Sequence, residues 1–74
     1  MFDEREAVVL EVRPWDVHGV PHVDVTVVYP DRRVDTARLG RESVPADLAS
    51  GETVRVRLVM STVVEIVRAQ EPQT

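Results

Sequence analysis

Valine recurs at alternate positions along most of this chain, and that period restricts the fold more than any other feature. The clearest case is residues 23–29, in which three valines and a tyrosine occupy every second position. Successive side chains of a β-strand point to opposite faces, so this period predicts a strand with one apolar face. Similar runs occupy residues 6–13, 52–59 and 63–68, and a weaker one occupies residues 33–39. The sequence therefore predicts an all-β domain of five strands.

Proline and glycine separate the predicted strands. Pro14, Gly19 and Pro21 fall close together, and proline cannot donate to a strand ladder. We therefore expect a loop over residues 14–21. Pro30 suits the second position of a tight turn, because its ring fixes φ near the required value. That turn would join the second and third strands as a hairpin.

One short helix is expected between the third and fourth strands. Pro45 suits a first helical turn, Asp47 complements the positive helix end, and Gly51 suits a left-handed exit. We place the helix at about residues 45–49, with Leu48 as its core anchor. Three strands, a helix and two strands follow one another in the OB-fold, a partly open five-stranded Greek-key barrel. A small OB-like barrel is thus the expected fold, and an SH3-like barrel is the alternative.

The alternation also assigns the core. The residues expected to face inward are Val8, Leu10, Val12, Val23, Val25, Val27, Val54, Val56, Leu58, Val64 and Ile66. In the first strand Val9 competes with Val8 and Leu10 for the inner face. We expect one domain over residues 1–69 and a flexible polar tail over residues 70–74.

Composition narrows the classes of function. The formal charge is −4, every basic residue is arginine, and aromatic residues make up 4% of the chain. A general nucleic-acid binder needs a basic track and stacking platforms, so nucleic-acid binding is not favoured. With no cysteine, no signal-like start and no apolar run near the roughly 20 residues of a spanning helix, we expect a cytoplasmic protein. A barrel this small predicts a binding module, not an enzyme, with no cofactor.

Short motifs over residues 35–67 resemble the C-terminal half of a molbindin or TOBE domain. The matching segments are residues 36–38 (TAR), 40–43 (GRES), 51–54 (GETV) and 60–63 (MSTV), with Leu48 between them. The family's N-terminal motif has no counterpart in residues 2–6, and Val59 stands where the family has lysine. The resemblance implies an oligomeric OB-type barrel that binds molybdate or tungstate. It implies ligand roles for Ser43, Ser61 and Thr62, which otherwise suit a helix cap and a turn.

Histidine and aspartate gather near the predicted loop. His18, His22 and Asp24 are residue types that bind divalent metals, and a loop residue with two strand residues would make a facial site. The alternative interpretation is a polar, solvated loop. Trp15 suits either a partner contact or a cap on the barrel core.

Apolar residues on both faces of some strands predict self-association. The expected outer-face residues are Val9, Val28, Val63 and Val67. One barrel has one interior and cannot bury both sets, and exposed apolar surface on a small protein marks an interface. We therefore expect a homo-oligomer. Another protein is the alternative partner.

Overall fold

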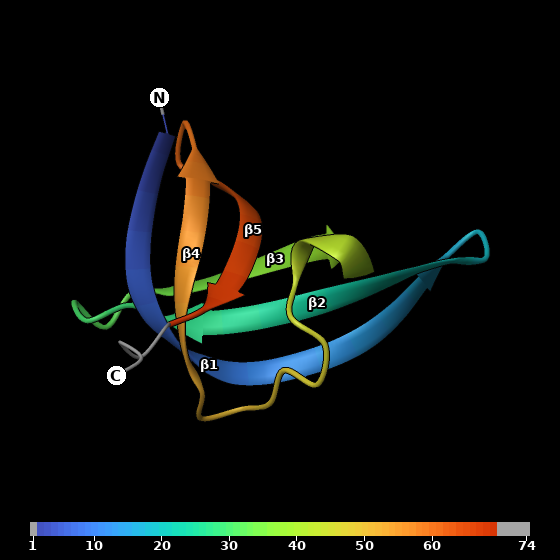
Figure 1. Ribbon diagram of the computed structural model, residues 1–74, viewed down its shortest axis with the longest axis horizontal. Coiled ribbons are helices and arrows are strands. Elements are labelled where there is room, and N and C mark those ends of the chain that lie inside the picture. Colours follow the sequence, from blue (N-terminus) through green and yellow to red (C-terminus); the bar gives the residue numbers. More distant parts are fainter. Residues whose placement is uncertain (1, 70–74) are drawn as a thin grey trace, which may run out of the picture.

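Five antiparallel strands form one sheet in the computed structural model, which describes residues 2–69 (Figure 1). The elements are β1 (Phe2–Val17), β2 (Val20–Val28), β3 (Val34–Gly40), the 3₁₀ helix η1 (Arg41–Ser43), β4 (Thr53–Val59) and β5 (Thr62–Arg68). The strand order is β3-β2-β1-β4-β5. The prediction of an all-β domain of five strands is confirmed. The tail predicted at residues 70–74 lies outside the described residues.

The long strand β1 organises the sheet. Its first half pairs with β4, from Phe2 opposite Val59 to Val8 opposite Thr53, and its second half pairs with β2 as far as Val17 opposite Val20. Figure 1 shows β1 bending between these two halves, so that β4 and β5 stand across the direction of β2 and β3. The edge strands β3 and β5 approach each other without pairing in the described residues. The sheet is therefore strongly curved and is not closed.

The core lies inside this curve. It consists of Ala7, Val9, Val25, Val27, Tyr29, Leu39, Val54, Val56, Leu58 and Ile66. Six of these were predicted from the alternation, and they lie on β2, β4 and β5. Val12, Val23, Val44 and Leu48 are half-buried against the core. Within residues 2–69 no polar or charged residue is buried, so the interior is entirely apolar.

Two β-bulges overturn part of the predicted core. The register of β1 shifts between Val9 and Glu11, and Val9 is buried with 1% of its surface exposed, whereas Val8 and Leu10 are exposed. The register of β5 shifts opposite Arg57 and Leu58. There Val63 packs against the core and Val64 is 40% exposed. An extra residue in one strand moves the following side chains to the opposite face, which simple alternation does not anticipate.

The helix predicted at residues 45–49 is absent. The helical turn comes earlier, at η1, and Asp47 has φ of 62°, in the left-handed region that interrupts a right-handed helix. The carbonyl of Ala46 accepts a hydrogen bond from the Arg68 guanidinium at 3.0 Å, where a helix would use it internally. No helix among residues 2–69 is long and apolar enough to cross a membrane.

The loop predicted at residues 14–21 is also wrong, because β1 and β2 continue through it to a two-residue turn. His18 and Gly19 have φ of 50° and 81°, the pair of positive values that closes a tight hairpin. Pro14 lies beyond the part of β1 that pairs with β4, and Pro21 lies beyond the pairing of β2 with β3. Each proline therefore sits where its strand has a partner on one side only, which a strand tolerates.

Candidate binding surfaces

The far end of the β1–β2 hairpin, residues 12–23, projects from the body of the molecule and is called the arm. Figure 1 shows it extending along the longest axis, and the chain between β3 and β4 passes across its base. That chain, residues 41–52, is called the connection. A groove of about 690 Å³ lies between the two. Pockets of this volume commonly hold ligands.

The walls of the groove are mainly apolar. The arm contributes Val12, Pro14, Pro21 and Val23, and the connection contributes Val44, Pro45 and Leu48. Val12 and Val23 follow the core residues along the inner face of the arm, so the groove extends the core surface outward. This groove was not predicted from the sequence, because residues 14–21 were expected to form a loop. The signal was present in Val17-His18-Gly19-Val20, a turn dipeptide between valines that favours a hairpin.

The connection is held in place by Arg68 of β5. Its Nε donates to Glu52 Oε1 at 2.8 Å and its Nη2 donates to the Ala46 carbonyl at 3.0 Å. Glu52 Oε2 also accepts the Ala49 amide at 2.9 Å. The hydrogen bond from Arg68 is the main cause of the lowered pKa of Glu52, and the one from the Ala49 amide adds to it. The wall of the groove formed by the connection is thus tied to β5 by charged hydrogen bonds.

Trp15 lies on the arm and is 46% exposed, so it does not cap the core. The Arg38 guanidinium stacks over its ring at 4.6 Å from the centroid. Arg38 also binds Asp24 through both fork positions, Nε to Oδ1 at 2.7 Å and Nη2 to Oδ2 at 3.0 Å. The Arg38 hydrogen bond is the largest cause of the lowered pKa of Asp24. This cluster clamps β1, β2 and β3 together at the base of the arm.

The structure does not assemble the predicted metal site. His18 forms the turn of the arm, and His22 Nδ1 donates to the carbonyl of Val20 at 3.0 Å. Asp24 is bound by Arg38. Within residues 2–69 no group of three or more histidine, aspartate or glutamate side chains is placed to hold a metal ion. His18 and His22 therefore belong to the hairpin, and Asp24 belongs to the cluster of Arg38, Asp24 and Trp15.

Ser61 lines two polar hollows, Thr62 lines one of them, and Ser43 ends η1. The hollow of about 330 Å³ contains Arg5 and Arg33 but also Asp3 and Asp35. Arg5 stacks over Tyr29 at 4.3 Å, and the Tyr29 hydroxyl donates to Asp35 at 3.3 Å. Burial is the main cause of the raised pKa of Tyr29. The positive charges are matched by carboxylates, so the hollow has no net attraction for an oxyanion.

The outer face of the sheet carries a row of three valines. Val8 lies opposite Val28, and Val28 lies opposite Val34, so that the row crosses β1, β2 and β3. Val34 is 60% exposed, Val8 is exposed and Val28 is half-buried. Leu10, the extra residue of the bulge, is exposed close by on β1. These three residues, Val8, Val28 and Val34, are called the valine row.

The four valines that were predicted to share the outer face lie in different places in the structure. Val28 belongs to the valine row. Val67, half-buried, lies opposite Arg55 at another part of the outer face. Val9 is in the core and Val63 packs against it, so neither is available to a partner.

Comparison with known proteins gives no relative. No family model matches this chain, and neither does any curated protein or solved structure. The function is therefore argued from the surfaces alone.

Proposed function

We propose that this chain is a non-enzymatic assembly module, an OB-like barrel that associates with a second copy of itself through the valine row. The strand order supports the OB-like assignment over the SH3-like one. In the structure β1 is shared between β2 and β4, β3 and β5 approach each other, and η1 lies between β3 and β4. These features support the assignment to a partly open Greek-key barrel.

The valine row is the observation that carries the proposal. Three aligned valines on neighbouring strands, with Leu10 beside them, form one continuous apolar strip on a face that the body leaves uncovered. Burying such a strip against another copy removes apolar surface from water at about 25 cal/mol per Å². A domain of this size has a marginal core, and partner surface adds to it.

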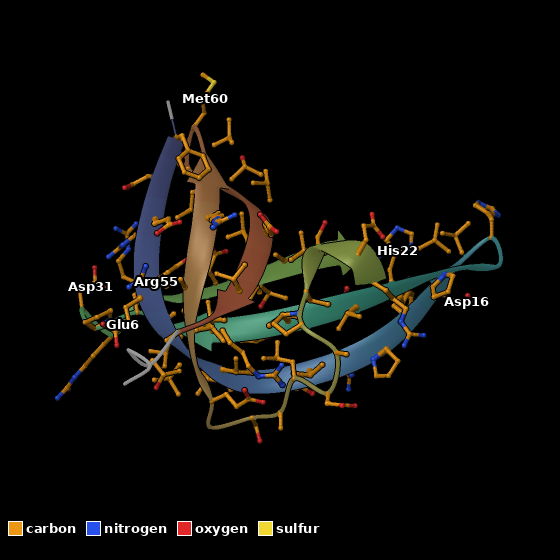
Figure 2. The ribbon with its side chains drawn as sticks, in the orientation of Figure 1. Glu6, Asp16, His22, Asp31, Arg55 and Met60 are labelled. Atoms are coloured by element: carbon orange, nitrogen blue, oxygen red, sulfur yellow. The ribbon has the colours of Figure 1, made fainter. Side chains whose placement is uncertain are left out.

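The charges beside the valine row suit a two-fold contact. Glu6 and Arg55 lie opposite each other next to the row, and Figure 2 shows them on the same side of the molecule. A two-fold axis brings the same patch of both copies together, so a patch that carries both signs can pair with itself. Oppositely charged rims then help to set the orientation.

The strongly held carboxylates favour a structural role. Asp24 and Glu52 have lowered pKa values because arginine hydrogen bonds stabilise their charged forms. A general acid or base near neutral pH needs a pKa close to 7. The two alternatives from the sequence, oxyanion binding and nucleic-acid binding, have less support. The hollow beside Ser61 is charge-balanced, and Asp24 neutralises Arg38 beside the single tryptophan.

Light scattering after size exclusion tests the proposal. We expect a mass of twice the 8.3 kDa chain at micromolar concentration, and a monomer for Val34→Asp. Val34 is exposed on an edge strand, so its replacement leaves the core intact. Val20→Asp is the matched control, because Val20 is equally exposed but lies at the end of the arm, and it should remain dimeric. A monomeric wild-type chain, or a dimeric Val34→Asp variant, would refute the proposal.

A further inference from the structure

We infer that the groove between the arm and the connection binds an apolar segment of a partner protein that carries lysine or arginine beside its apolar residues. This site is separate from the valine row and does not depend on self-association.

The groove offers apolar surface with little freedom to rearrange. Pro14 and Pro21 form part of the arm wall and Pro45 part of the connection wall, and each has a fixed φ. Leu48 and Val44 are held against the core, and Arg68 ties the connection to β5. A site formed before binding loses little conformational entropy when it is filled, which favours affinity. Proline also removes backbone donors from the arm wall, so recognition there depends on side chains.

The charges around the groove are predominantly negative. Asp16, Glu42 and Asp47 line it, against the single guanidinium of Arg41. Within residues 2–69 none of these three carboxylates lies within 4.0 Å of an arginine or histidine nitrogen. Opposite potentials on two surfaces steer them together and suppress wrong partners. An apolar segment flanked by lysine or arginine therefore complements this groove.

The same charges select against a second copy as the occupant. Each copy carries a net charge of −4, so a second copy does not complement the negative charges of the groove. The groove and the valine row are thus assigned to different partners. The partner in the groove is a basic–apolar segment, and the partner on the valine row is another copy.

Fluorescence of Trp15 provides the readout, because it is the only tryptophan and it lines the groove. The probes are two capped peptides with the same Leu-Pro-Leu centre, one flanked by lysines and one by glutamates. We expect the lysine peptide to bind at least tenfold more tightly, and its affinity to fall as salt rises. The double variant Glu42→Gln/Asp47→Asn should lose several-fold affinity for the lysine peptide.

Asp31→Asn is the control, since it removes one carboxylate charge at the end of the molecule away from Asp16 and His22 (Figure 2). It should bind the lysine peptide as the wild type does. Equal affinity for both peptides, or no binding of either at millimolar concentration, would overturn the inference. So would dissociation of the wild-type dimer by the peptide, because the groove would then belong to the second copy. A monomeric wild-type chain that still prefers the lysine peptide would refute the dimer and leave this inference standing.

Discussion

The two halves of β1 lie in different environments, although they belong to one strand. Residues 2–8 have β4 on one side, and Ala7 and the adjoining Val9 are buried. Residues 12–17 have only β2 beside them, and the arm contains no buried side chain. A two-stranded ribbon is marginal alone. The body of the sheet is thus stabilised by its apolar core, whereas the arm depends on the Arg38 clamp and on the body to which it is attached.

Shortening a core side chain should produce the largest difference in stability between the body and the arm. Val56 is fully buried in the body, so Val56→Ala should lower the free energy of unfolding by about 2 kcal/mol, from lost transfer energy and a residual cavity. Val20→Ala, on the arm, should change it by less than about 0.5 kcal/mol. Urea denaturation of both variants measures the difference. Equal losses would show that the arm and the body share one core.

Removing the clamp should loosen the arm alone. Arg38→Ala takes away the fork that binds Asp24 and the cation above Trp15, so amide hydrogen exchange in residues 12–23 should become several-fold faster. Amides of β4 should exchange as before. Arg38→Lys keeps the charge but cannot make both fork bonds, and it should restore only part of the protection. Faster exchange throughout the sheet would mean that the clamp supports the whole fold.

Acid should weaken the arm and the connection together. The pKa values of Asp24 and Glu52 are lower in the folded protein than their usual values, so their pairing stabilises the fold above the ordinary carboxyl range of about 4. That contribution disappears as the pH falls through the lowered pKa values, and it is constant between pH 6 and pH 8. Asp24→Asn should reduce the acid sensitivity of exchange in the arm. An unchanged pH profile in that variant would assign the effect to other carboxylates.

The smallest effect is expected at the bulge. Leu10 is exposed on the single chain, so in the monomeric Val34→Asp background Leu10→Ser should change the free energy of unfolding by less than about 0.5 kcal/mol, while the neighbouring Val9→Ser should cost several times more. Thermal or urea unfolding separates the two. A large cost at Leu10 in that background would show that its apolar side chain is buried within the monomer.

Prediction from sequence succeeded where the period of two is unbroken and failed where a bulge or a distant side chain intervened. The inward residues of β2 and β4 were predicted correctly, but Leu10 and Val64 were assigned to the wrong face by the bulges beside them. The metal site failed because Asp24 is bound by Arg38, which lies fourteen residues away on β3. The groove was missed because two prolines were taken to end a strand.

The all-β class, the five strands and the small apolar core could be predicted from the sequence alone, because the spacing of valine is a local property that follows from strand geometry. The folded chain was needed to show which strands have partners on both sides, where the bulges fall and which carboxylates arginine neutralises. Those outcomes depend on side chains far apart in the chain. The groove and the valine row, on which the proposed functions rest, both depend on these long-range contacts.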